Sequence, residues 1–236
     1  DADICIMAYV LLFVPQPVLD APKQGSFQYH PSLLPMHRGP SSINWPIAMG
    51  AEQTGLTIFW PNEGLDEGPV LLQKTCDIGP DETLGDIYFK KLYPMGVDAM
   101  IEALDMVKAG RAPRINQNLD EGSYESWFGK PQAEIDWRLP SDQIYNTIRA
   151  SNPQPGAWTT NSGVKVQIFN SKLVESAGGK AGTVLRLDDE GLIIATGDDR
   201  GILISRVRAE GGGKISASDY ASDCQLSVGS MFGSLT

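Results

Sequence analysis

The pattern of this 236-residue sequence changes near residue 111, and the change limits the folds that the chain can adopt. Before it, apolar strand-like runs alternate with helical segments, as in an α/β layer with a parallel or mixed sheet. After it, short strand-like runs are separated by Gly, Asn and Asp, which is typical of a small β-barrel or sandwich. A chain of this length holds one large domain or two smaller ones, and the change favours two.

The first half predicts a domain over residues 1–116. Its first run, residues 2–13, is β-branched and apolar along its length, so we expect a strand buried on both faces of a sheet. Further strands are expected at 26–30, 54–60 and 69–78, and helices at 14–25, 41–50 and 80–110. The last helix is expected to break or kink at residues 94–96, where a proline interrupts the pattern.

The second half predicts a separate β domain. Residues 117–133 are polar and irregular, so they are expected to form a linker. One helix is predicted at 140–151, with Ser141 as its N-cap. The strand-like runs that follow predict a small β-barrel (OB-like) domain over 134–222. Residues 223–236 carry little pattern and are expected to be a loose tail.

Composition excludes several classes of protein. Nineteen basic and 29 acidic residues give a net charge of −10, which repels nucleic acid on average. The longest apolar run is about half the length that a membrane helix needs, and no signal peptide is visible. Three widely spaced cysteines predict free thiols in a reducing, cytoplasmic compartment, and with two histidines they leave little material for a metal site.

Two titratable residues follow predicted strands. His30 ends one strand and Asp66 lies in a turn after another, and ligands of open α/β sheets bind beyond strand ends. A carboxylate beside an imidazole raises its pKa and orients the ring for proton transfer. Gln28 lies two residues before His30 and therefore faces the same side, where its amide can donate to a developing oxyanion.

The same residues also have ordinary structural explanations. A histidine after a strand is often a hydrogen-bonded structural residue, and an aspartate in a Gly-rich segment is by default a turn residue. His37, beside an arginine and a glycine, is interpreted as a loop residue without a role in chemistry.

The segments HPSLLPMHRGPSSINW and NEGLDEGPVLL place His30 and Asp66 36 residues apart. Together they resemble the formyltransferase family that uses 10-formyltetrahydrofolate, which includes methionyl-tRNA formyltransferase and the hydrolase domain of 10-formyltetrahydrofolate dehydrogenase. IRASNPQPGAWT and the strands after it are similar to the C-terminal domain of that family. The resemblance implies a partial Rossmann-like domain followed by a small β-barrel. It also implies an N-terminal sheet region outside this sequence, so we expect the natural protein to be longer.

The resemblance implies roles for individual residues. His30 and Asp66 match the catalytic histidine and aspartate, and Gln28 stands where most members carry a catalytic asparagine. The Leu34–Pro35 bond is expected to be cis. The loops that hold the pterin ring of the folate are matched by the backbone of Val10, Leu11, Leu12 and Phe13 and by that of Asn62, Glu63 and Gly64.

The implied formyl donor is 10-formyltetrahydrofolate, with no metal. The similarity is greatest to the hydrolase-type members, which favours water as the acceptor, with formate and tetrahydrofolate as products. Methionyl-tRNA is the second candidate acceptor, although the net charge disfavours it. An amino sugar and a non-catalytic folate-binding module remain as alternatives.

Overall fold

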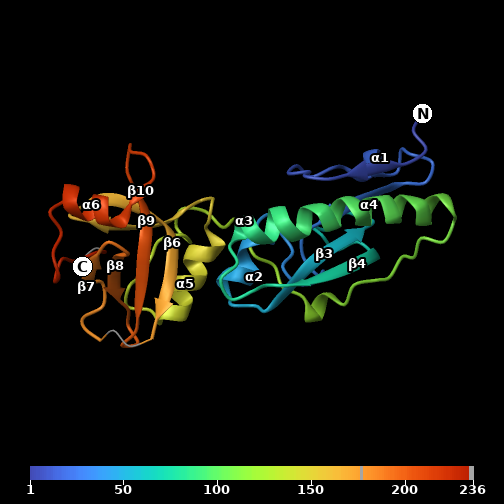
Figure 1. Ribbon diagram of the computed structural model, residues 1–236. Coiled ribbons are helices and arrows are strands. Elements are labelled where there is room, and N and C mark those ends of the chain that lie inside the picture. The colour runs from blue at the N-terminus through green and yellow to red at the C-terminus, as the bar shows by residue number, and fades with distance from the viewer. Residues whose placement is uncertain (176–177, 234–236) are drawn as a thin grey trace. The chain divides into compact units, whose positions relative to one another are not determined.

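The computed structural model describes residues 1–175 and 178–233 (Figure 1). The chain divides into two compact units. Unit 1 contains Asp1–Pro46 and Ala51–Trp127, and unit 2 contains Ile47–Gly50 and the chain from Phe128 onward. The division after Trp127 lies inside the segment that the sequence predicts as a linker, residues 117–133.

Unit 1 is built on a mixed four-stranded sheet with the order β1-β2-β3-β4. Its strands are β1 (Cys5–Met7), β2 (Ser26–His30), β3 (Gln53–Phe59) and β4 (Val70–Asp77). The pair β1–β2 is parallel, and β2–β3 and β3–β4 are antiparallel. This arrangement confirms the expected mixed sheet. In β3 every residue after Gln53 is buried, which identifies it as the central strand of the core.

The prediction of a long buried strand at residues 2–13 is wrong. Only Cys5–Met7 is a strand, and it lies at the edge of the sheet. Tyr9 then adopts a left-handed backbone conformation (φ 57°), and Leu11 and Leu12 are 72% and 83% exposed. Among the described residues no strand pairs with the outer side of β1, so extending it would bury no further apolar surface.

One long helix covers this sheet, as Figure 1 shows for α4 along β3 and β4. Up to Trp127 the helical segments are α1 (Gln16–Leu19), α2 (Asn44–Ala48), α3 (Leu84–Asp86), the π-helix η1 (Ile87–Leu92), α4 (Tyr93–Lys108) and the 3₁₀ turn η2 (Leu119–Glu121). The last two residues of α2 are among those assigned to unit 2. The expected helix at 14–25 is therefore reduced to one turn. α4 buries Gly96, Ala99, Ala103 and Val107, the spacing of a single helix face.

The expected break near residues 94–96 lies a few residues earlier, in η1. Pro94 is the second residue after η1, and Leu92 before it is itself helical (φ −66°, ψ −37°). The missing N–H of Pro94 therefore leaves a carbonyl of the preceding turn without a helical donor, which is consistent with the wider π-turn there. Gly96 is required by packing, because a Cβ atom there would lie 2.8 Å from the ring of Tyr29 on β2. A small residue at this position therefore lets α4 lie close to the sheet that ends in His30.

Unit 2 contains an antiparallel sheet with the order β5-β6-β9-β8-β7, and β10 pairs with β9. Its strands are β5 (Ala157–Asn161), β6 (Val164–Val174), β7 (Val184–Asp188), β8 (Gly191–Ala195), β9 (Gly201–Ala209) and β10 (Ile215–Ser216). Its helices are α5 (Ser141–Ala150) and α6 (Ala217–Asp223). The closed barrel that the sequence predicts is not observed, because β5 and β7 do not pair with each other in the described part of the chain.

A C-terminal segment bridges the two end strands. The amide of Val184 on β7 donates to the Ser230 carbonyl at 2.8 Å, and the amide of Gly233 donates to Thr160 on β5 at 2.8 Å. Phe232 is only 4% exposed and belongs to the core of unit 2. These residues lie within the stretch predicted as a tail, 223–236, and the structure packs them against the sheet.

The expected N-cap of α5 is also different. Pro140 is the N-cap residue, and Ser141 is the first residue of the helix. The Ser141 amide and hydroxyl both donate to Asp198 Oδ2, at 3.1 and 2.9 Å. A carboxylate 57 residues away therefore satisfies the helix start, as a side-chain cap would. No helix in the described ranges is long and apolar enough to cross a membrane.

The packing of Phe232 predicts a stability effect. Phe232→Ala should lower the free energy of unfolding by about 3–5 kcal/mol, the usual loss for a buried phenylalanine. Urea denaturation followed by fluorescence measures it. Val228→Ala is the control, since Val228 is 66% exposed and its loss should change stability by less than about 0.5 kcal/mol. Equal effects of the two substitutions would show that the C-terminal segment does not stabilise unit 2.

Candidate active site

The loop after β2 is held by side-chain hydrogen bonds to its backbone. Ser32 Oγ donates to the Met36 carbonyl at 2.7 Å, and Thr57 Oγ1 donates to the Ser32 carbonyl at 2.7 Å. The Leu34 amide donates to Thr57 Oγ1 at 3.0 Å, and Gln73 Nε2 donates to the Leu34 carbonyl at 2.7 Å. These buried contacts fix the loop to β3 and β4.

The bond between Leu34 and Pro35 is cis, as the resemblance leads us to expect. The loop as a whole carries the chain from His30, at the end of β2, to His37.

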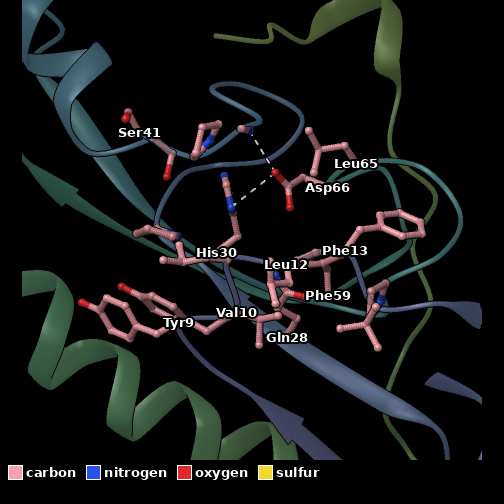
Figure 2. Close-up of a pocket in the computed structure, with 18 of the residues that line it drawn as sticks. Tyr9, Val10, Leu12, Phe13, Gln28, His30, Ser41, Phe59, Leu65 and Asp66 are labelled. Carbon is pink, nitrogen blue, oxygen red and sulfur yellow. Dashed lines mark hydrogen bonds and ion pairs between the residues drawn. The ribbon is translucent and has the colours of Figure 1, made fainter. Parts of the chain in front are cut away.

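His30 lies between two oxygen atoms. Its Nε2 is 3.0 Å from the His37 carbonyl oxygen, and its Nδ1 is 3.7 Å from Asp66 Oδ2. The His30 side chain is only 6% exposed. Since a carbonyl oxygen only accepts, the contact with His37 requires a hydrogen on Nε2. In the neutral ring Nδ1 then carries a lone pair and faces the carboxylate, as Figure 2 shows.

Asp66 is held from both its side chain and its backbone. The Gly39 amide donates to Asp66 Oδ2 at 2.9 Å, and Gln117 Nε2 donates to the backbone carbonyls of Asp66 (2.9 Å) and Gly68 (2.7 Å). Asp66 has a left-handed backbone (φ 57°), and Gly68 lies so close to Trp60 that a Cβ atom would meet its carbonyl oxygen. The GLDEG spacing therefore serves a tight turn that aims the carboxylate at His30.

Burial lowers the pKa of His30. The negative charge of Asp66 raises that pKa, but the loss of hydration outweighs it. The carboxylate thus raises the pKa of His30, as the sequence predicts, but burial of the ring has the larger effect and lowers it. At neutral pH the ring is uncharged and can accept a proton.

A cavity of about 280 Å³ opens beside this pair, at the lower end of the range for small-molecule sites. Its lining comes from the segments 9–14, 28–31, 39–44 and 61–66, together with Leu19, Phe59 and Trp127. All of these segments belong to unit 1. Figure 2 shows His30 and Asp66 on one wall and the loop carrying Val10, Leu12 and Phe13 on another.

The structure brings most of the predicted site residues to this cavity. His30, Asp66 and Gln28 line it, as do Val10, Leu11, Leu12, Phe13, Asn62 and Gly64. Glu63 does not line it and is exposed. Asn62 Oδ1 accepts a hydrogen bond from the Gly64 amide at 3.0 Å, which shapes the turn at this end of the cavity.

Sequence reasoning missed several polar contributors. Ser41, Ser42 and Asn44 line the cavity where the chain leads into α2, and Gln117 and Gly39 fix Asp66. The polar run in GPSSIN, directly after the histidine loop, was the available signal for the first three. Gln117 lies 51 residues from Asp66, and no local pattern indicates that contact.

His37 makes an unexpected contact. Its Nδ1 is 3.2 Å from Glu125 Oε2, and the two side chains are only 14% and 12% exposed. Within the described residues no three His, Cys, Asp or Glu side chains lie close enough to hold a metal ion. The three cysteines are unbridged, as expected.

Comparison with known proteins identifies the family. The Formyl transferase family matches residues 1–104, and the Formyl transferase, C-terminal domain family matches residues 129–225. Methionyl-tRNA formyltransferase of Syntrophus aciditrophicus is 35% identical over 232 residues, which are 98% of this chain and 74% of that protein. The chain belongs to the formyltransferase family. Its two units correspond to the two matched regions of that family.

Other relatives are much longer than this chain. The mitochondrial 10-formyltetrahydrofolate dehydrogenase of Mus musculus is 37% identical over 238 residues, which cover 96% of this chain and 26% of the dehydrogenase. The chain thus spans about a quarter of the length of such relatives. The crystal structure of HypX from Aquifex aeolicus in complex with tetrahydrofolic acid is also similar, with a TM-score of 0.76 and 25% identity. That match covers 96% of this chain and 39% of HypX.

The lowered pKa of His30 predicts how stability depends on pH. The unfolded chain protonates this group near pH 6.5, while the folded protein does so only at lower pH. The stability that the neutral ring contributes is therefore complete above pH 6.5 and is lost as the pH falls. Against His30→Gln, the native protein should lose up to about 1.4 kcal/mol more unfolding free energy per pH unit below 6.5. Parallel curves in urea denaturation between pH 5 and 7.5 would contradict this.

Proposed function

We propose that this formyltransferase-family chain binds 10-formyltetrahydrofolate in the cavity of unit 1 and transfers the formyl group to water. The observation that carries the proposal is the buried His30–Asp66 pair at the cavity wall, with Nδ1 of the neutral ring facing the carboxylate. A neutral imidazole within reach of a nucleophile is a suitable general base. Similarity to a tetrahydrofolate-bound structure and to the dehydrogenases supports folate as the ligand.

Proton transfer in this mechanism runs through Nδ1. Water attacks the formyl carbon while its proton moves to His30 Nδ1, and Asp66 stabilises the imidazolium that forms. The positive charge of the protonated ring stabilises the tetrahedral oxyanion, and the amide of Gln28 donates to it. When the C–N10 bond breaks, Nδ1 returns the proton to N10, which leaves tetrahydrofolate and formic acid, and the acid loses its remaining proton to water to give formate. One C–O bond forms and the C–N10 bond breaks, so the reaction requires neither a metal nor a redox partner.

The apolar loop of the cavity suits a flat aromatic ligand. Leu12 and Phe13 are exposed and line the cavity, and Asn62 and Gly64 also line it. Backbone N–H and C=O groups provide oriented partners for the edge of a pterin, and the apolar side chains cover its faces. The cavity volume suits the ring of the folate, with the remainder of the molecule extending into solvent.

Transfer to methionyl-tRNA is a second candidate, favoured by the relative that shares most of its length with this chain. A basic surface on unit 2 also favours it. Lys165 lies 3.9 Å from the ring centre of Trp158, and Lys214 lies 3.7 Å from that of Phe169, with Arg208 beside the same ring. In the described chain none of these three cations has a carboxylate within ion-pair distance. The net charge therefore does not describe this surface, where cations without ion pairs could contact the phosphates of a nucleic acid.

Two further candidate functions stand beside transfer to water and transfer to methionyl-tRNA. An amino sugar would place the same chemistry on a carbohydrate amine, and a non-catalytic module would bind folate without turnover. A cytoplasmic location is part of the proposal, because the cysteines are unbridged as in a reducing compartment.

Substitutions at the buried pair test the mechanism. His30→Ala and Asp66→Asn should each lower turnover of 10-formyltetrahydrofolate by about 10²–10⁴-fold, since each removes part of the proton-transfer machinery. Binding of a non-hydrolysable folate analogue, measured by isothermal titration calorimetry, should change little. Near-native turnover in either variant would exclude the assigned roles. Analogue binding by the native protein without any turnover would favour the non-catalytic module.

An acceptor screen separates the proposed functions. With formyl-labelled 10-formyltetrahydrofolate, we expect label in formate in the absence of any amine. Addition of methionyl-tRNA or of an amino sugar nucleotide should not divert it. If methionyl-tRNA becomes labelled, the second candidate is correct. In that case Lys214→Glu should weaken tRNA use and leave hydrolysis of the donor unchanged.

A further inference from the structure

The tautomer of the neutral His30 ring depends on which of two nearby oxygens receives its single N–H. The His37 carbonyl oxygen lies 3.0 Å from Nε2, and the Asp66 carboxylate lies 3.7 Å from Nδ1 on the other side. A neutral imidazole carries a single N–H, so it donates to one of these oxygens and not to the other. A carboxylate is the stronger acceptor of the two. The ring therefore keeps Nδ1 free only while the carbonyl stays in place.

The backbone that presents this carbonyl is unusual. His37 has a φ of 56°, in the left-handed region that non-glycine residues rarely adopt. Such a conformation persists when the surroundings determine it. What surrounds His37 therefore decides whether its carbonyl remains aligned with His30.

A segment from far along the chain holds His37 in this conformation. The His37 amide donates to Ser123 Oγ at 2.9 Å, and its ring Nδ1 contacts Glu125 Oε2 at 3.2 Å. On the next residue, the Arg38 amide donates to the Ser123 carbonyl, and the Glu125 amide donates to the Arg38 carbonyl, both at 3.1 Å. Residues 123–125 are thus bound to residues 37–38 by both backbone and side-chain hydrogen bonds.

We propose that Glu125 is a positioning residue for His30. Through the His37 side chain it holds the His37 carbonyl on Nε2 and thereby keeps Nδ1 unprotonated, so that this atom can accept a proton. Glu125 is absent from the cavity lining, and its side chain contacts His37, so the carboxylate acts on His30 through His37. This inference rests on the proposed function for its catalytic consequence, while its effect on the ring can be measured separately.

A purely structural role for this pair would have different consequences. If the His37–Glu125 pair only stabilised the fold, its loss would lower the unfolding temperature. The molecules that remain folded would then keep the native tautomer of His30. If it positions His30, its loss lets the single ring proton move from Nε2 to Nδ1, towards Asp66. The ring would then present a donor where the reaction requires a base.

Nitrogen-15 NMR of the two histidine rings tests the proposal, because ring ¹⁵N shifts distinguish the two tautomers. In the native chain we expect His30 in the Nε2–H form. Glu125→Ala should convert a measurable fraction to the Nδ1–H form and lower kcat by about 10–100-fold, the loss typical of groups that orient a histidine from behind. The KM for 10-formyltetrahydrofolate should stay within about threefold, since Glu125 does not line the cavity.

Two further variants serve as controls. Glu125→Gln keeps an oxygen that accepts from His37 Nδ1–H, so it should retain the native tautomer and most of the activity. Glu121→Ala removes an exposed carboxylate from the same segment and should change neither quantity. If Glu125→Ala does not fold, Ser123→Ala is used instead. It weakens the same attachment of residues 123–125 to His37, because it removes the oxygen that accepts from the His37 amide.

An unchanged His30 tautomer in Glu125→Ala, or in Ser123→Ala where that variant is used, would overturn the proposal. Equal loss of activity in Glu125→Ala and Glu121→Ala would do the same. If the native chain shows no turnover, the proposed function fails, and the ¹⁵N comparison still decides whether Glu125 positions the ring.

Discussion

The hydrogen bond from His30 Nε2 to the His37 carbonyl is the contact on which the site depends. It determines the tautomer of a buried neutral ring and leaves Nδ1 to face Asp66. Loop 30–37 must therefore keep its shape, and it does so through buried bonds to Thr57 and Gln73 on the neighbouring strands. The sheet, the cis-proline loop and the segment 123–125 all act on this one contact. The mixed sheet of unit 1 thus supports the loop that keeps the proton of the His30 ring on Nε2.

Asp66 illustrates how backbone and side chain serve the same end. Its carboxylate accepts the Gly39 amide, while Gln117 ties down the carbonyls on either side of the turn. Both contacts limit rotation of the carboxylate, so its charge acts on His30 from a fixed direction. Fixed polar groups of this kind stabilise charge without the reorganisation that water would require.

Much of the framework could be predicted from the sequence, because local patterns determine it. The strands at 26–30 and 69–78 and the site pair His30–Asp66 are examples, since strand ends and a Gly-rich turn are local features. The errors concern properties that depend on distant neighbours. Residues 2–13 look like a buried strand, but no strand of the described residues pairs with the outer side of β1. The pKa of His30 depends on burial, which no residue spacing reports.

The two histidines show the same limit within one short stretch. His30 can be singled out because a strand precedes it. His37 is interpreted from its neighbours in sequence as a loop residue, and no local pattern indicates its partner Glu125, 88 residues away. In unit 2 the expected barrel gave way to an open strand path, bridged by residues near Phe232 that carry little sequence pattern. Contacts between remote segments decide both cases.

The apolar loop at residues 10–13 has a thermodynamic consequence. Leu12 and Phe13 meet water in the described chain although they line the cavity. A ligand that enters covers part of this surface, so association carries a negative heat-capacity change. Its enthalpy therefore becomes more favourable as the temperature rises, while the entropic gain from released water declines. Leu12 and Phe13, whose apolar side chains a folded protein would normally bury, are therefore exposed at a surface that a ligand in the cavity covers.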